Sequence, residues 1–273
     1  LANQLRSKQK NRKHNSSAQF AHFAGATRLP GKAEGNITIF WFEHGWFWFI
    51  PLADGTTSVG AVCWAYYLKA RDKPLKDYFF DTIALCPELQ DRLKDATLVD
   101  DAVHATGNFA YSSTHATGDR YLMVGDAFTF IDPMFSSGVF LAMQSAFDGA
   151  KLVQTALDRP AELAAAREAL EKRMRVGPRD YSWFIYRVTN PTIRDMFMHP
   201  QNIFSVKQGL MSLLAADIHQ EGPRYRRSLL MFKVVYYFVS LLNFRRTYAG
   251  WKRHRFNIRD MGMLRGETVM KAD

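Results

Sequence analysis

The segment Tyr121–Gln144, with the sequence YLMVGDAFTFIDPMFSSGVFLAMQ, contains the residue types with the clearest potential for chemistry. Asp126 follows a short apolar run, Arg120–Val124, that we expect to be a buried strand. A carboxylate at the end of such a strand is well placed to accept hydrogen bonds from ligand hydroxyls. The Ser-Ser-Gly sequence that ends at Gly138 then opens a predicted helix, whose free N–H groups and positive dipole end favour an anion or an electron-rich group. These residues therefore predict a ligand site.

An ordinary strand, loop and helix without a ligand is the alternative for this segment. In that case the Ser136 hydroxyl would serve only as the N-cap of the helix. This alternative does not account for Gly-Asp, Asp-Pro and Ser-Ser-Gly occurring within fourteen residues. On these residues alone, both interpretations stay open.

A second segment, Trp46–Pro51, has the sequence WFWFIP. Alternation along a strand places Trp46, Trp48 and Ile50 on one face and the two phenylalanines on the other. Hydrophobicity alone favours a strand that is buried on both faces. His44, just before this strand, fits a surface or hydrogen-bonded structural histidine better than an active-site group.

The elements that must position these residues follow from the sequence pattern. The expected strands are Asn36–Leu52, Thr57–Tyr67, Val103–Ser113 and Arg120–Val124, with a turn at Asp54-Gly55 between the first two. The expected helices are Leu75–Leu93, broken at Pro87, then Ser136–Leu157, Pro160–Arg175 and most of the chain after Pro178. The helix Ser136–Leu157 has apolar residues at helical spacing, at Val139, Ala142, Met143, Ala146, Ala150 and Val153. We place the best boundary near Pro160.

Composition excludes several classes of protein. The chain has 273 residues, 47% hydrophobic and 23% charged, which excludes a disordered, collagenous or coiled-coil protein. Its two cysteines, Cys63 and Cys86, exclude a disulfide scaffold and a four-cysteine zinc site, and they indicate a reducing, cytoplasmic compartment. The histidines show no metal-ligand spacing, so no metal is predicted. The net charge is +10, but no nucleic-acid motif accompanies it, and we predict no nucleic-acid partner.

Much of the positive charge brackets one apolar stretch. Arg224–Arg227 and Arg245–Arg255 flank Ser228–Phe244, which has the sequence SLLMFKVVYYFVSLLNF. A helix here would have a wide apolar face and a narrow polar stripe, formed by Arg226, Lys233 and Ser240. The stretch is shorter than the ~20 apolar residues of a typical membrane span. A helix packed on its own domain, a helix in a membrane interface and a transmembrane helix all remain open, and the second makes peripheral membrane contact an expected interaction.

Two motifs together resemble a known family. The sequence G-D-A-x-x-F-I-D-P-x-F-S-S-G, over Gly125–Gly138, resembles the second flavin-binding motif of the flavin-dependent halogenase and monooxygenase superfamily. W-x-W-x-I-P, about eighty residues earlier, resembles the motif that distinguishes the halogenases from their monooxygenase relatives. The resemblance covers most of Ala18–Val153. It implies an α+β/α/β, FAD-dependent monooxygenase-like (PHBH-type) fold, with an aromatic substrate sheet plus the second flavin-binding motif in residues 1–159 and a helical C-terminal region in residues 160–273.

The resemblance also implies roles for individual residues. The cofactor FAD would be bound by Gly125, Asp126, Asp132, Pro133, Ser136, Ser137 and Gly138. Asp126 would bind the ribityl chain, Pro133–Gly138 would lie against the isoalloxazine ring, and the amides of Ser137 and Gly138 would bind the halide. Trp46 and Trp48 would be walls of the catalytic site, between flavin and substrate.

The sequence departs from the family in two respects. It contains neither the G-x-G-x-x-G turn that holds the FAD pyrophosphate nor the catalytic lysine in a matching motif. We therefore expect this chain, whose first residue is Leu1, to be the C-terminal portion of a longer flavoenzyme that lacks most of the N-terminal dinucleotide-binding part. Free-tryptophan halogenases carry a glutamate where this chain has Phe135, so the resemblance implies a phenol, a pyrrole or a carrier-tethered substrate instead.

The predicted function is flavin-dependent halogenation of an electron-rich aromatic or acyl-carrier-tethered substrate, using FADH2, O2 and halide, with a separate flavin reductase as partner. One alternative is an FAD-dependent monooxygenase or oxidoreductase that acts on a lipid-like or aromatic substrate. Another is a truncated, non-catalytic fragment that binds a carrier protein. Carrier proteins are acidic, and the +10 charge would steer them toward the chain.

Overall fold

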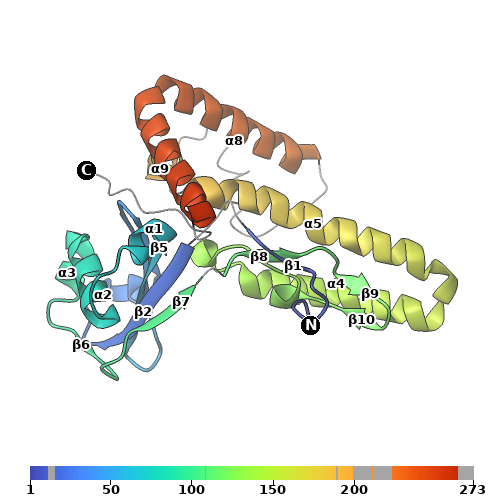
Figure 1. The fold of residues 1–273 in the computed structure, drawn as a ribbon, viewed down its shortest axis with the longest axis horizontal. Coiled ribbons are helices and arrows are strands. Elements are labelled where there is room, and N and C mark those ends of the chain that lie inside the picture. Colours follow the sequence, from blue (N-terminus) through green and yellow to red (C-terminus); the bar gives the residue numbers. More distant parts are fainter. Residues whose placement is uncertain (12–15, 108, 189, 199–210, 212–222, 264–273) are drawn as a thin grey trace. The chain divides into compact units, whose positions relative to one another are not determined.

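The computed structural model describes residues 1–11, 16–107, 109–188, 190–198, 211 and 223–263 (Figure 1). Contacts divide the chain into two compact units. The first unit joins Leu1–His14 to Ala110–His254, and the second joins Asn15–Phe109 to Arg255–Asp273. Each unit is described by itself below. The domain boundary predicted at residues 159 and 160 falls inside the first unit and stays a prediction.

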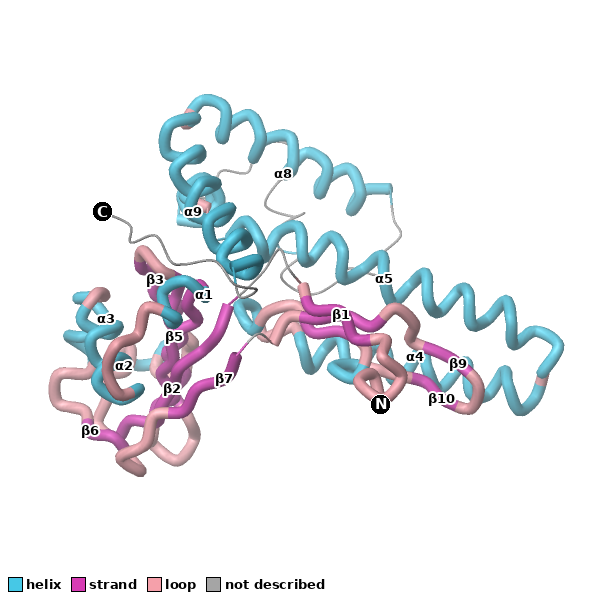
Figure 2. Tube along the Cα trace, viewed as in Figure 1, coloured by secondary structure: helices cyan, strands magenta, loops and turns pink. Residues whose placement is uncertain are grey.

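The second unit is built on a six-stranded antiparallel sheet, drawn in magenta in Figure 2. Its strands are β2 (Ser16–Ala24), β3 (Thr38–Phe42), β4 (Gly45–Pro51), β5 (Thr57–Trp64), β6 (Thr97–Leu98) and β7 (His104–Gly107). The order is β3-β4-β5-β2-β6, and β7 also pairs with β2. Its helices are the 3-10 helix η1 (Gly31–Ala33) and the α-helices α1 (Ala65–Lys69), α2 (Leu75–Ala84) and α3 (Pro87–Arg92).

One face of this sheet forms a core with helices α2 and α3. Phe47 and Phe49 of β4 are fully buried and belong to one cluster with Phe79 of α2 and Leu89 of α3. Cys63 and Cys86 belong to the same cluster as free thiols, and burial raises the pKa of both. The aromatic alternation predicted for β4 is confirmed, because the register places Trp46 and Trp48 opposite Val62 and Gly60 on the other face.

The strand predicted over Asn36–Leu52 is wrong in one respect, because it is a hairpin of β3 and β4 that turns at Glu43-His44. Gly45 permits this turn to lie close to β5, since a Cβ at Gly45 would stand 1.9 Å from the Val62 carbonyl oxygen. The strand predicted over Thr57–Tyr67 ends at Trp64, where α1 begins. The helix break predicted at Pro87 is confirmed, with Pro87 in the first turn of α3.

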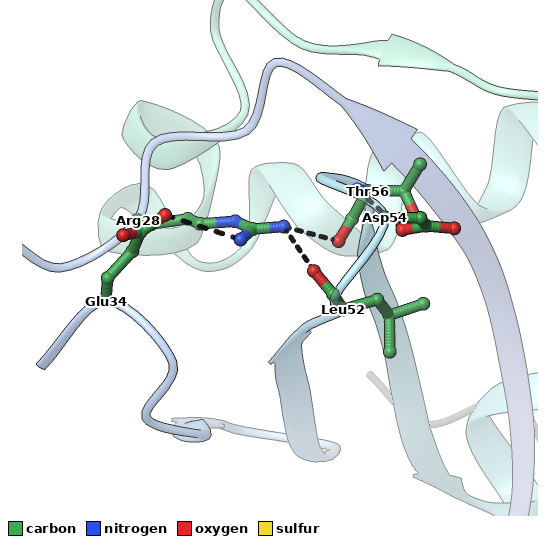
Figure 3. Close-up of polar contacts among 5 residues, drawn as sticks. All are labelled: Arg28, Glu34, Leu52, Asp54 and Thr56. Atoms are coloured by element: carbon green, nitrogen blue, oxygen red, sulfur yellow. Dashed lines mark hydrogen bonds and ion pairs between the residues drawn. The ribbon is translucent and has the colours of Figure 1, made fainter.

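The predicted turn at Asp54-Gly55 is confirmed and is held by an arginine (Figure 3). One Arg28 guanidinium nitrogen donates to the carbonyl oxygens of Leu52 at 3.0 Å and Thr56 at 2.7 Å, and the other contacts Glu34 at 3.5 Å. The Asp54 carboxylate accepts from the Thr56 backbone N–H at 2.9 Å and from its hydroxyl at 2.7 Å. Arg28 therefore fixes the turn that follows the W-x-W-x-I-P strand.

The first unit combines two small antiparallel sheets with long helices (Figure 1). Strands β1 (Lys8–Lys10), β8 (Tyr111–Ser113) and β11 (Thr129–Phe130) form one sheet, and β9 (Thr117–Gly118) and β10 (Tyr121–Leu122) form the other. The helices are the 3-10 helices η2 (Gly125–Ala127), η3 (Pro133–Phe135) and η4 (Pro160–Glu162), and the α-helices α4 (Gly138–Asp158), α5 (Leu163–Val188), α6 (Pro191–Met198), α8 (Pro223–Leu242) and α9 (Phe244–Met263). Helix α9 belongs to this unit up to His254.

Two predicted strands differ from the strands that the structure shows. The strand expected over Val103–Ser113 is two strands, β7 and β8, which belong to different sheets in different units. A buried strand was expected over Arg120–Val124, but the strand is the two-residue β10. Within Arg120–Val124, only Met123 is buried. The short pairing with β9 is sufficient to hold this segment in place, because Met123 also packs in the core with Leu152, Leu170 and Met174 of α4 and α5.

Helix α4 buries the side opposite to the one that its apolar pattern indicates. Val139, Met143 and Val153, three of the apolar residues expected at helical spacing, are 72%, 58% and 50% exposed. The buried residues are Ser145, Asp148, Gly149, Leu152 and Thr155. The helix itself is confirmed, although it begins at Gly138 rather than Ser136.

Helix α8 packs on α5 through aromatic rings. Phe232 and Tyr236 of α8 lie 6.3 Å and 5.5 Å from Trp183 of α5, and Phe232 lies 5.7 Å from Phe184, all between ring centroids. Within the described residues, none of the helices alone combines the length and apolar character of a membrane crossing, whereas Arg227–Leu242 and Phe244–Lys252 together do, with a bend of 101° between them.

Glu171 connects α5 to the β9–β10 ribbon. Its carboxylate accepts from the backbone N–H groups of Ala116 at 2.6 Å and Thr117 at 2.9 Å, and from Arg175 at 2.7 Å. Burial tends to raise the pKa of Glu171, but the donors from Arg175, Thr117 and Ala116 outweigh it and hold the pKa below its usual value.

We expect Glu171→Gln to lower the free energy of unfolding at pH 7 by about 1–3 kcal/mol, because charge-assisted acceptors of two buried N–H groups are lost. Folding lowers this pKa, so the stabilisation is present above the unfolded pKa and is lost as pH falls through the folded pKa. The difference between the two proteins should therefore shrink below about pH 4. Urea unfolding from pH 3 to 7 measures it, with the exposed Glu168→Gln on the same helix as control. An equal loss in both variants would contradict the assignment.

Candidate functional site

The predicted ligand residues meet in one pocket of the first unit, between η2, β11 and the start of α4. The pocket is lined by five of them, namely Gly125, Asp126, Asp132, Ser137 and Gly138. The other two lie in the connection between these residues, with Pro133 in η3 and Ser136 directly after it. Residues separated by up to thirteen positions thus form a continuous surface because η3 folds the chain back onto α4.

The Gly125-Asp126 dipeptide is held against α4. Gly125 has φ +51°, and a Cβ there would lie 2.8 Å from the Cβ of Ala142, so only glycine fits. The Gly125 N–H donates to the Ser145 hydroxyl at 2.9 Å, which itself donates to the Ala142 carbonyl oxygen at 2.9 Å. From the other side, the Tyr111 hydroxyl donates to the Asp126 carbonyl oxygen. Burial and the nearby Asp126 carboxylate raise the pKa of Tyr111, so it remains the donor at neutral pH.

The turn between the two motif halves is fixed by Asp132 and Ser136. Asp132 is buried and accepts from the Met134 N–H at 2.9 Å, which caps η3. Ser136 has φ +51°, a left-handed conformation that is uncommon for a residue with a Cβ. Such strain persists where the surrounding structure over-determines it, and here it directs the next two residues into the pocket wall.

The start of α4 presents backbone donors rather than a serine cap. Ser137, not Ser136, is the N-cap residue, and its side chain makes no capping hydrogen bond. The alternative in which Ser136 merely caps the helix is therefore wrong. Helix α4 has 21 residues and no acidic residue in its first turn, so its first N–H groups and its dipole are left for an electron-rich group or an anion.

Several polar residues of the pocket wall were not found from the sequence, among them Gln144, Asp148 and Arg173. Asp148 of α4 is buried and accepts from Arg173 of α5 at 2.9 Å, while Gln144 approaches it at 3.4 Å. Arg173 compensates the charge of the buried carboxylate, which is costly to leave unpaired. The signal for Asp148 was the helical spacing of polar residues along α4, at Ser145, Asp148 and Thr155, which the apolar stripe on the opposite side outweighed.

The two tryptophans lie on the sheet of the second unit. Trp46 is buried and its ring centroid lies 6.2 Å from that of Trp48. The Trp48 indole lies flat on Gly60, since a Cβ there would stand 2.2 Å from its ring, and its N–H donates to the Ser58 hydroxyl at 3.1 Å. This strand and the pocket belong to different units, so the role of Trp46 and Trp48 as walls of a common site stays a prediction.

His44 is a structural histidine, as predicted. Its Nδ1 lies 2.9 Å from the Tyr66 hydroxyl, and its ring stacks on Tyr67 at 4.5 Å between centroids. Among the residues that the structure describes, no group of three His, Cys, Asp or Glu side chains could hold a metal ion.

We expect Ser145→Ala to speed hydrogen exchange of the Gly125 amide, because the variant removes its acceptor while leaving the backbone shape intact. The loss of one buried hydrogen bond should also lower the free energy of unfolding by about 1–2 kcal/mol. NMR-detected exchange measures the first effect and urea unfolding the second. Thr155→Val is the matched control, since that hydroxyl, also buried on α4, donates only to the Lys151 carbonyl of its own helix. Unchanged Gly125 exchange in Ser145→Ala would show that the hydroxyl does not hold the dipeptide.

Comparison with known proteins now gives this pocket a context. The chain is 31% identical over 157 residues to a tryptophan 2-halogenase of Chondromyces crocatus, covering 57% of this chain and 30% of that protein. It is 31% identical over 143 residues to a 1H-pyrrole-2-carbonyl-[peptidyl-carrier protein] brominase of Pseudoalteromonas luteoviolacea, covering 52% and 35%. The chain thus spans about a third of the length of these curated relatives.

A solved structure agrees with this. The myxobacterial chondrochloren halogenase CndH, an FAD-dependent halogenase, superposes with a TM-score of 0.62 and 25% identity, over 85% of this chain and 57% of that one. The chain therefore has a flavin-dependent monooxygenase-like fold. The family model for tryptophan halogenase matches residues 38–192, which include both predicted motifs and more than half of the chain. The protein belongs to the tryptophan halogenase family.

Proposed function

We propose that this chain is part of a flavin-dependent halogenase that acts on an electron-rich aromatic or carrier-tethered substrate. The observation that carries the proposal is the pocket in which the Gly125-Asp126 dipeptide, Asp132 and the start of α4 meet. Reduced FAD, with O2, supplies the oxidation of halide to hypohalous acid in this chemistry. The family match favours it over the monooxygenase on a lipid-like substrate and over the non-catalytic carrier-binding fragment.

The residues of the pocket fit a flavin. Asp126 is exposed at the pocket, while its backbone is held by Tyr111 and Gly125 is held by Ser145, so its carboxylate is available to accept hydrogen bonds from the ribityl hydroxyls. The Pro133–Gly138 segment, whose last two residues line the pocket, would lie against the isoalloxazine ring. The free amides at Ser137 and Gly138 would bind the halide, helped by the positive end of α4. Trp46 and Trp48 would separate this site from the substrate and exclude water.

Phe135 supports a substrate other than free tryptophan. Its ring lies 5.4 Å from that of Phe184 in α5, so an aromatic side chain occupies the position at which free-tryptophan halogenases carry a glutamate. A carboxylate at this half-buried position would lie beside the ring of Phe184, which offers it no hydrogen bond. A phenol, a pyrrole or an acyl group on a carrier protein needs no such carboxylate, and one relative is named for a pyrrole on a carrier protein.

The dinucleotide-binding part and the catalytic lysine would come from residues outside this chain, with residues 1–159 and 160–273 as the substrate and helical domains of the whole enzyme. The relatives are about three times as long as the matched segments. The exposed apolar side of α4 also supports this. It is formed by Val139, Phe140, Met143, Phe147, Val153 and Leu157. Such a stripe is unfavourable in water, and the missing part would cover it.

A separate flavin reductase would supply FADH2, and peripheral contact with a membrane is a further proposed interaction.

The function is tested with the full-length enzyme, a flavin reductase, FAD, NADH, O2 and bromide, offered free tryptophan, a phenol and a pyrrole on a carrier protein. Mass spectrometry should show a brominated phenol or pyrrole product and unmodified tryptophan. Hydroxylated product at every bromide concentration would contradict halogenation, and no product on any substrate with bound flavin would support the non-catalytic alternative.

In the same full-length enzyme, Asp126→Ala should weaken FAD binding roughly ten- to hundred-fold, because one charge-assisted hydrogen bond of about 1.5–3 kcal/mol is lost. Quenching of flavin fluorescence on titration measures the dissociation constant. Asp158→Ala, which removes an exposed acid at the far end of α4, should leave it unchanged. An unchanged constant in Asp126→Ala would rule out the ribityl role.

A further inference from the structure

Helix α8 packs one apolar side inward and leaves a second apolar stripe exposed. Its buried side consists of Leu229, Phe232 and Tyr236, which face α5. Lys233, expected in a solvent-facing polar stripe, lies instead with its Nζ 5.2 Å from the centre of the Trp183 ring. The exposed apolar residues of α8 recur at helical spacing, and they are Leu230, Val234, Tyr237, Phe238, Leu241 and Leu242.

The chain bends by 101° after α8 and continues as α9 (Figure 1), where further aromatic residues are exposed. Phe244 stacks on Tyr248 at 5.7 Å, and Tyr248 stacks on Trp251 at 5.7 Å, all between ring centroids. All three rings are about half exposed or more. We call the six exposed apolar residues of α8 and these three of α9 the α8–α9 surface. It is rich in tyrosine and tryptophan, whose rings favour the level of lipid headgroups.

Positive charge predominates in the sequence of α8 and α9. Between Arg224 and Arg259 the sequence has ten Lys or Arg residues and no Asp or Glu. Arg245 and Lys252 are exposed on α9 beside the stacked rings, and Arg246 pairs with Asp195 of α6 at 3.2 Å. Basic residues next to an exposed apolar and aromatic surface are attracted to anionic lipid headgroups while the apolar side chains enter the interface.

We propose that the α8–α9 surface binds peripherally to a membrane that contains anionic lipid. The exposed stripe of α4 provides the contrast, because it is equally apolar but has no comparable basic cluster, with acidic Asp158 at its end. The α4 stripe, which has no basic cluster, suits burial against the rest of the same protein. The cationic α8–α9 surface instead favours an anionic binding partner. The proposal goes beyond halogenation and does not depend on it. It would place the enzyme where hydrophobic substrates or products accumulate.

The experiment is sedimentation with lipid vesicles, using this chain and the full-length enzyme without flavin or halide. Both should bind vesicles of phosphatidylcholine with 30% phosphatidylglycerol roughly tenfold or more tightly than phosphatidylcholine alone, and the difference should fall between 0.05 and 0.5 M salt, as about 1 kcal/mol per basic residue implies. F238S/L241S should weaken binding to both vesicles at least roughly tenfold. R245Q/K252Q should weaken binding to the anionic vesicles alone.

Matched variants keep the test specific. F147S/L157S removes two equally exposed apolar residues from α4, and K32Q/K172Q removes two exposed charges that belong to neither α8 nor α9, so neither should change binding. Circular dichroism and melting temperature identify any variant that fails to fold, and R245Q/K252Q alone then still tests the charge dependence. Three results would overturn the proposal: equal losses in the control variants, vesicle binding by the chain but not by the full-length enzyme, or binding to an acidic carrier protein or a second copy without vesicle binding.

Discussion

The close contact between the Gly125-Asp126 turn and helix α4 is the constraint on which the pocket depends. A turn can approach a helix this closely only where one partner lacks a Cβ and the other presents a small side chain, and Gly125 against Ala142 satisfies both conditions. Ser145 then satisfies the one N–H group that this approach would bury. The motif residues and α4 therefore form one structural element. A change in the helix would displace the cofactor residues even if none of them were altered.

This constraint also explains why α4 has polar residues on its buried side. The pocket needs hydrogen-bonding groups along the helix, so Ser145, Asp148 and Gln144 take positions where a core helix would have leucine. Arg173 from α5 neutralises the carboxylate, and Glu171, two residues earlier, fastens α5 to the β9–β10 ribbon. The hydrophobic contribution of α4 within this unit is correspondingly small, and its apolar residues are free to serve another contact.

Much of the site could be predicted from sequence because its information is local. Gly-Asp, Asp-Pro and Ser-Ser-Gly each encode a backbone conformation or a hydrogen-bonding group within a few residues, and all of them meet at the pocket or its connecting turn. The errors came from features that local patterns do not encode. The turn at Glu43-His44 depends on space beside Val62, and the division of Val103–Ser113 depends on which sheet offers each half a partner. Helical periodicity identified α4 and α8 but not which side of each is buried, since that depends on the neighbouring element.

Gly60 has a consequence for the tryptophan beside it. The Trp48 indole takes the space that a side chain at position 60 would fill, and Ser58 holds its N–H. Its rotational freedom is thus given up when the sheet folds. A flat ligand that stacked on this ring would lose only its own entropy on binding, which is the thermodynamic advantage of a rigid aromatic platform. An alanine at position 60 would remove no functional group. It would still remove that advantage, because the Trp48 ring would have to lift off the sheet.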